Sequence, residues 1–296
     1  MAIFIAVQSV GLVFLRENIN LLQLISEVLG LGLPVLLYML LSKRIKTHGF
    51  FEKVKFKNIL LISLVTLLTI PVSMLVASFN VWLVENTVGL TKALDSVIEL
   101  SSFSDYLIAI GVMAIAPAIC EELAFRTIFF SGLGSLGKKR AFILVSLFFS
   151  LAHAVPEKLL STFLLSILLC YFLYRTGSIW ASVTAHFVNN FAAITISYIA
   201  GMFTDTSGPE ESIIIKGVSQ ELIPFIFWGI LSAMVIPMIV ILLKKFHNNT
   251  KATSLNFEKS EKFSGTALAA FLPALAFYLI LLGSVILSNI LIDFPM

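Results

Sequence analysis

Long runs of apolar residues, separated by short polar and charged segments, recur along the whole chain. Each run is continuous and long enough for a helix to cross most or all of a bilayer, whose core takes about 20 helical residues. None shows the alternation of a barrel strand. The runs lie at about residues 20–42, 59–84, 105–133, 141–156, 159–175, 178–202, 222–243 and 266–292. The pattern predicts an all-α polytopic membrane helix bundle of about eight transmembrane helices.

Two apolar segments are shorter than a full membrane span. The run at 141–156 is short and ends at Pro156, so we expect it to pair with 159–175 as a tight hairpin. Residues 1–15 are apolar but lack a basic leader and a cleavage signal. As a helix they would span only about 22 Å, so we expect an interfacial or lead-in helix.

Composition supports the membrane assignment. Of 296 residues, 58% are hydrophobic and 12% are charged, and the mean hydropathy is +1.00. Soluble domains carry about 25% charged residues. The formal net charge of +3 is small, and the basic residues lie between apolar runs, so they indicate topology and no nucleic-acid partner is expected.

The connecting segments alternate in charge. Basic segments follow the first, third, fifth and seventh runs, whereas the segments 85–105 and 203–221 are acidic. This alternation obeys the positive-inside rule with the basic segments in the cytoplasm. Both termini would then lie outside the cytoplasm, provided that residues 1–15 do not cross. We expect a multi-pass protein, of a bacterial cell membrane.

Two adjacent glutamates, Glu121 and Glu122, interrupt the third run. A carboxylate at the bilayer centre costs roughly 2.5–3.5 kcal/mol or more, so such residues are usually compensated or functional. Arg126 follows Glu122 by four residues, on the same helix face, which favours an ion pair. Glu121 has no partner of this kind. Glu27, in the first run, is expected to face the end of another helix, with a position on the substrate side as the alternative.

Histidine and asparagine side chains interrupt two further runs. His153 is near the end of the fourth, and His186 and Asn190 share one face of the sixth. Counted from the basic ends at 1.5 Å per residue, Glu121, His153 and Asn190 lie about 18 Å deep and His186 about 12 Å deep. Three helices therefore place polar residues in one layer of the membrane, as a shared buried site requires.

This set of side chains allows two kinds of hydrolytic chemistry. A glutamate beside a neutral histidine can deprotonate water, and histidine and asparagine can stabilise an oxyanion. Alternatively, Glu121, His153 and His186 form the donor set of a catalytic zinc site. No H-E-x-x-H or G-x-S-x-G motif is present. Cys120 and Cys170, both in apolar runs, are expected to pack as small hydrophobic residues.

Three motifs together resemble a known family. Glu121-Glu122-x-x-x-Arg126, Phe149-x-x-x-His153 and His186-x-x-x-Asn190 occur in this order on successive predicted helices. They resemble the motifs of the CPBP intramembrane proteases, which include CAAX prenyl protease 2, bacteriocin-processing (Abi) enzymes and proteins similar to lysostaphin resistance protein A. The resemblance covers about residues 105–200.

The resemblance implies a role for each motif residue. Glu121 corresponds to the base that activates water, with His153 as its partner. His186 and Asn190 correspond to the pair that stabilises the oxyanion. The metal-free mechanism is the one we expect, because the histidines are not at the usual zinc spacing, but a divalent zinc ion remains an alternative.

The remaining motif residues are expected to support this site. Glu122 and Arg126 correspond to an ion pair that orients the motif helix, although Glu122 is also a candidate for a share in catalysis. Phe149 is expected to pack, shaping the floor of the site, and Asn189 to lie off the catalytic face.

We therefore expect three regions: two helices with their lead-in at 1–104, a four-helix catalytic core at 105–202, and a C-terminal helix pair at 203–296. The resemblance implies an endopeptidase acting on membrane proteins or peptides in the lipid bilayer. The bacterial members act in peptide maturation, bacteriocin immunity or regulation through partner membrane proteins. The alternatives are a non-catalytic scaffold for a partner membrane protein and a proton- or ion-coupled transporter.

Overall fold

The computed structural model describes residues 18–42, 50–87, 100–153, 155–203 and 222–250, together with the isolated positions 7, 14, 15, 276 and 279. Within these residues the protein is helical and contains no strand; Phe51 and Ser178 form one isolated antiparallel bridge. The all-α class predicted from the apolar runs is confirmed.

The helices follow the predicted runs closely. In chain order they are α2 (Ile19–Ile25), η1 (Ser26–Gly32), α3 (Leu33–Leu41), α5 (Phe56–Thr87), α6 (Phe103–Ala109), η2 (Ile110–Ile115), α7 (Ala116–Glu122), η3 (Leu123–Phe129), α8 (Phe130–Gly132), η4 (Gly134–Leu136), α9 (Lys138–Ala152), η5 (Pro156–Lys158), α10 (Leu159–Thr176), α11 (Ile179–Phe203) and α12 (Leu222–Asn249). The expected hairpin is present, because α9 packs against α10 and Ser150 Oγ lies 2.8 Å from Thr162 Oγ1.

Five of the described helices are long and apolar enough to cross a membrane: Ile19–Leu41, Phe56–Thr87, Phe103–Gly132, Pro156–Thr176 and Leu222–Asn249. The protein is thus an integral, multi-pass membrane protein, but the expected number of about eight spans is not confirmed. Helix α9 has only 15 residues, and α11 carries histidine and asparagine at its centre. The predicted span at 266–292 and the acidic connecting segments fall largely outside the described residues, and so does most of the lead-in. The proposed division into three regions stays a prediction.

Two of the long helices contain π-helical turns. One turn, η1, divides the first span, and η2 and η3 flank α7 in the third. A π-helical turn inserts a residue into the helix and turns the following side chains, and such turns are frequent at functional sites. All three lie next to the acidic residues of these helices: η1 contains Glu27, and α7 ends at Glu122.

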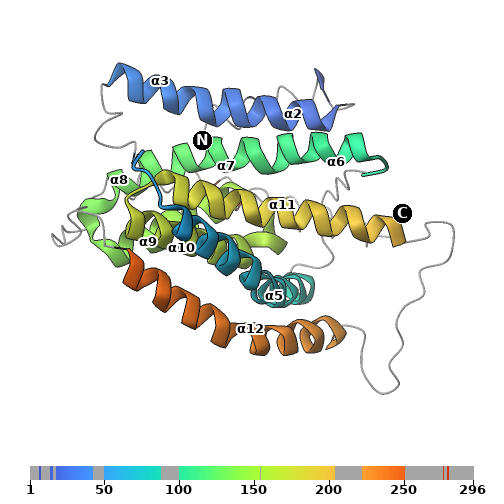
Figure 1. Ribbon diagram of the computed structural model, residues 1–296. Coiled ribbons are helices and arrows are strands. Elements are labelled where there is room, and N and C mark those ends of the chain that lie inside the picture. The colour runs from blue at the N-terminus through green and yellow to red at the C-terminus, as the bar shows by residue number, and fades with distance from the viewer. Residues whose placement is uncertain are drawn as a thin grey trace.

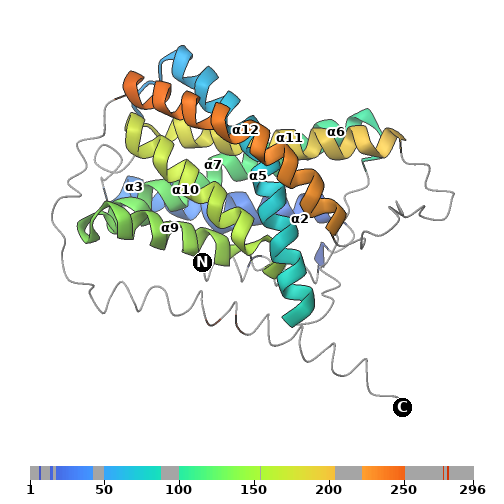
Figure 2. The same ribbon diagram turned by 90° about the horizontal axis from the view of Figure 1, so that it is seen from below.

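The first and third spans lie side by side, and α11 runs along the other side of the third (Figure 1). A second layer forms where α12 packs along α5 (Figure 2), while α5 also contacts α10 and α11. One buried apolar cluster joins η1, α7, η3, α9 and α10, and another joins α5, α10, α11 and α12. The polar residues of the third span are thus enclosed by neighbouring helices.

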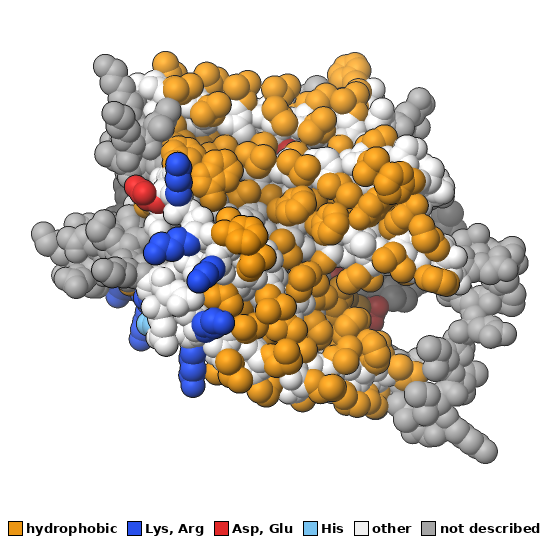
Figure 3. Space-filling view, in the orientation of Figure 1, with side chains coloured by type: hydrophobic (Ala, Val, Ile, Leu, Met, Phe, Trp, Pro, Cys, Tyr) orange, Lys and Arg blue, Asp and Glu red, His pale blue; other side chains and the backbone are white. Residues whose placement is uncertain are grey.

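The basic connecting segments meet at one end of the bundle. Ile179 N donates to Phe50 O at 2.7 Å, Arg175 Nη2 donates to His247 O at 2.6 Å, and Lys138 Nζ lies 4.3 Å from the centre of the Tyr174 ring. Lysine and arginine side chains gather at one end of the face shown in Figure 3, beside a broad apolar surface. The acidic segments lie largely outside the described residues, so the alternation of charge stays a prediction.

Candidate active site

Glu122 lies at the centre of a buried polar cluster. Its Oε2 atom is 3.0 Å from Nε of Arg126, and neither side chain is exposed. Its other oxygen, Oε1, is 3.1 Å from Nδ1 of His186 on α11. A carboxylate paired with a guanidinium can only accept hydrogen bonds, so this contact places a hydrogen on Nδ1. The expected Glu122–Arg126 pair is present, and it also fixes the orientation of the His186 ring.

Glu121 faces the opposite nitrogen of the same imidazole. Its Oε2 atom lies 3.8 Å from Nε2 of His186, and its side chain is 12% exposed. That distance is too long for a hydrogen bond. The same oxygen is buried and has no hydrogen-bond partner in the described structure. The two adjacent glutamates therefore differ: Glu122 is held by two cationic or donor groups, whereas Glu121 keeps an oxygen available for another molecule.

Phe149 packs between the other candidates. Its ring is fully buried. The centre of this ring lies 4.9 Å from the guanidinium carbon of Arg126 and 5.7 Å from the centre of the His186 ring, in an edge contact. The centre of the His153 ring lies 4.8 Å from the centre of the Phe149 ring. Phe149 thus packs against Arg126 and both histidines, and its expected role as the floor of the site stays a prediction.

His153 ends helix α9. Its Nδ1 atom lies 2.8 Å from the carbonyl oxygen of Phe149, one turn earlier. Because a carbonyl only accepts, this contact puts the hydrogen on Nδ1 and leaves Nε2 of a neutral ring as an acceptor. Among the described residues the structure gives no contact between His153 and Glu121, so their predicted partnership stays a prediction.

Asn190 has a different neighbour from the one expected. Its Nδ2 atom donates to Met113 O at 3.0 Å, and its Oδ1 atom accepts from Asn189 at 3.1 Å. Met113 lies four residues before Pro117, which has no N–H to donate to that carbonyl. Asn190 therefore joins α11 to a backbone acceptor that proline has exposed. This arrangement does not place its amide beside Glu121, and an oxyanion role for Asn190 stays a prediction.

The described residues do not form a metal centre. They bring together no group of three or more histidine, cysteine, aspartate or glutamate side chains in an arrangement that holds a metal ion. Of the alternative zinc donors, Glu121 and His186 approach each other, whereas no contact of His153 with either is found among the described residues. Zinc requires its donors at about 2.0–2.2 Å from one point, and this set does not fit it.

An apolar cavity lies in another part of the bundle. A pocket of about 330 Å³ opens between α5, α10, α11 and α12, with an almost entirely apolar lining that includes Thr69, Leu168 and Asn189. None of the candidate carboxylates or histidines lines it. Asn189 stands between this pocket and the polar cluster, because it donates to Asn190.

Glu27 is a further buried acidic residue close to the motif helix. This residue is 4% exposed and lies in η1, which packs against α7. The signal was present: an acidic residue in an apolar run followed by Gly30, Gly32 and Pro34. The expectation that it faces the end of another helix, or the substrate side, stays a prediction.

The fold and these residues define a class: polytopic helical membrane proteins with a buried glutamate–histidine cluster. Comparison with family models identifies the domain. Residues 103–192 match the model described as type II CAAX prenyl endopeptidase, Rce1-like. The resemblance to the CPBP and CAAX proteases is thereby confirmed for this segment, which contains all three motifs, and it implies a membrane protease. Neither curated proteins nor solved structures gave a match.

Proposed function

We propose that the protein is an intramembrane endopeptidase that hydrolyses peptide bonds of membrane-associated proteins or peptides with water activated by Glu121. The observation that carries the proposal is the contrast between the adjacent glutamates. Glu122 is committed to Arg126 and His186, whereas the Oε2 atom of Glu121 is buried without a hydrogen-bond partner and faces His186. The Rce1-like match over residues 103–192 supports the same chemistry.

In the proposed reaction one water molecule is consumed for each peptide bond broken, and Glu121 ends in its starting protonation state. Glu121 takes one proton from water as the oxygen attacks the carbonyl carbon of the peptide, and it returns that proton to the leaving nitrogen when the C–N bond breaks. His186 in its doubly protonated form donates Nε2–H to the oxyanion, while Nδ1–H remains bonded to Glu122. In this proposal His153 is the partner of Glu121 at the water site. Asn190 holds α11 against η2.

The substrate class follows from the location of the site. A buried polar cluster between membrane helices is accessible to a chain that is anchored in, or enters, the bilayer. The matched model describes prenyl endopeptidases, so a prenylated peptide ending in Cys-aliphatic-aliphatic-X is one probe. A single-span peptide without a lipid is the other, because it tests whether the bilayer-embedded chain alone is enough for cleavage.

The test compares the wild type with Glu121→Gln, purified in detergent and offered both probes in H₂¹⁸O. Mass spectrometry measures cleavage and the ¹⁸O content of the new carboxyl group. We expect one ¹⁸O per cut and a fall in kcat of about 10²–10⁴-fold in the variant, the usual contribution of a general base. Glu85→Gln, an exposed site on α5, is the matched control and should retain full activity.

Three results would count against this function. Cleavage that survives Glu121→Gln would remove Glu121 from the mechanism. Products without ¹⁸O would exclude direct attack by water. A wild type that cleaves neither probe, while Glu121→Gln leaves its cellular role intact, would support the scaffold alternative.

A further inference from the structure

Glu27 is a buried acidic residue that the family match does not include. It lies in η1 of the first span, 76 positions before the matched segment begins at residue 103. Its side chain is 4% exposed and its Oε2 atom is buried without a hydrogen-bond partner in the described structure. Burial of an unpaired carboxyl group in a membrane helix is costly, so a residue of this kind is usually functional.

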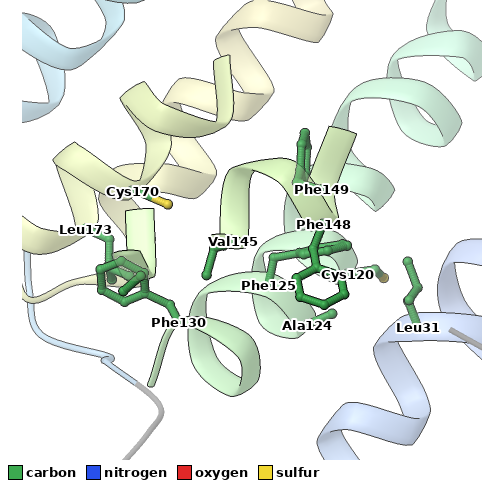
Figure 4. Close-up of a cluster of buried hydrophobic side chains, with 11 residues drawn as sticks. Leu31, Cys120, Ala124, Phe125, Phe130, Val145, Phe148, Phe149, Cys170 and Leu173 are labelled. Carbon is green, nitrogen blue, oxygen red and sulfur yellow. The ribbon is translucent and has the colours of Figure 1, made fainter. Parts of the chain in front are cut away.

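The helix that carries Glu27 is packed tightly against the motif helix. A Cβ atom added to Gly32 would lie 2.7 Å from Sγ of Cys120, so a larger residue would require the Cys120 side chain or η1 to shift. Leu31 of η1 and Cys120 of α7 belong to the same buried cluster, and Figure 4 shows them on facing helices. The backbone of η1 is therefore held beside the residue that precedes Glu121.

Glu27 and Glu121 come from two packed helical segments. Glu27 lies in η1 and Glu121 in α7, and these two segments are in contact. Each of the two glutamates has an Oε2 atom that is buried and without a hydrogen-bond partner among the described residues. Unpaired buried oxygens from two different helices are the usual sign of an ordered water molecule that bridges them.

We propose that Glu27 is a further residue of the active site: in its protonated form it donates a hydrogen bond to the water molecule that Glu121 deprotonates, and so positions that water for attack. This inference rests on the proposed function. Two carboxyl groups in one desolvated site do not carry two full negative charges. The nearest cationic groups, Arg126 and His186, contact Glu122. Glu27 therefore supplies the hydrogen, and Glu121 accepts from the water.

The first test measures kinetics in Glu27→Leu and Glu27→Gln. Leucine removes the donor, and we expect kcat to fall about 10²-fold, the cost of a misplaced reactant, with KM unchanged. Glutamine keeps a donor at the same place, so it should restore most of kcat. Thermal unfolding of Glu27→Leu should occur at the same or a higher temperature, because an unpaired buried carboxyl group has been removed.

The second test needs no substrate. The infrared spectrum of the wild type should show the C=O stretch of a buried carboxylic acid, shifted in D₂O and absent from Glu27→Gln but present in Glu85→Gln. A wild type without this band would overturn the proposal.

Kinetics separate this inference from the proposed function. Full kcat in Glu27→Leu, together with loss of cleavage in Glu121→Gln, would overturn the role of Glu27 alone. Full kcat in both variants would overturn the Glu121 mechanism as well. If the wild type proves inactive, the infrared band still decides whether Glu27 carries the proton.

Discussion

Nδ1 of His186 lies 3.1 Å from Oε1 of Glu122, although the two residues are 64 positions apart in the chain. The contact joins α11 to the motif helix and ties the orientation of a candidate catalytic imidazole to an ion pair on another helix. Arg126 completes the chain of contacts at 3.0 Å and also donates to Ser166 at 3.2 Å. Catalytic geometry and helix packing therefore depend on the same carboxylate.

Removal of Arg126 should destabilise the protein more than removal of the whole pair. Arg126→Met leaves Glu122 buried with only His186 beside it, and an uncompensated buried charge costs about 3–5 kcal/mol. The double variant Glu122→Gln/Arg126→Met leaves no charge behind and should recover most of the stability, measured by thermal unfolding in detergent. It should not recover activity, because the imidazole loses its ionised partner. Equal stability of the single and double variants would contradict the pairing.

The contact of Asn190 with Met113 predicts a coupling to Pro117. Asn190→Ala should cost about 1 kcal/mol, the usual range for an interhelical hydrogen bond in a membrane protein. Pro117→Ala supplies an N–H four residues after Met113, so the cost of Asn190→Ala should be smaller in that background. Urea or thermal unfolding of the four proteins forms the double-mutant cycle. Additive costs would show that Pro117 does not create the free carbonyl.

The same Asn190→Ala variant tests the oxyanion prediction. A role limited to helix packing predicts that kcat falls only in proportion to the loss of folded protein. A direct role in the oxyanion predicts a fall in kcat of about 10²-fold or more in protein that is fully folded. Asn248→Ala, exposed near the end of α12, serves as the control.

Gly32 should be intolerant of a side chain as long as Cys120 is present. Gly32→Ala brings a methyl group against Cys120 Sγ, so η1 should move away from α7 and activity should fall. Cys120→Ala removes the sulfur, and the double variant should regain activity. Gly111→Ala, whose added Cβ meets no atom within 4 Å, is the matched control. Failure of Cys120→Ala to rescue would show that the close approach of these helices is not what the site requires.

Chelation should leave cleavage unchanged. The described donors do not converge on one point, so dialysis against a chelator is expected to alter neither kcat nor the unfolding temperature. Metal content measured by mass spectrometry should stay far below one ion per chain. Loss of activity with chelator and its return with zinc would establish the alternative donor set of Glu121, His153 and His186.

Local patterns in the sequence were sufficient for part of the site. The Glu122–Arg126 pair depends only on spacing within one helix, and the structure contains it. The depth count placed His186 about 6 Å nearer the basic end than Glu121, yet His186 is the residue that lies against both glutamates. The same count gave Asn190 the depth of Glu121. Asn190 instead contacts Met113, and no contact with Glu121 was found among the described residues. Depth along a helix does not specify which side of the neighbour a residue meets.

The sequence by itself determined the helical membrane class, most helix boundaries and the three motifs, because hydrophobic run length and helical periodicity are local properties of the chain. Only the tertiary structure decided that His186 bonds Glu122 and faces Glu121, that Phe149 contacts both histidines, and that the turn carrying Glu27 packs against the helix of Glu121. These relationships depend on the rotation and register of packed helices. Between membrane helices those variables are set by close packing and polar contacts, which no single segment encodes.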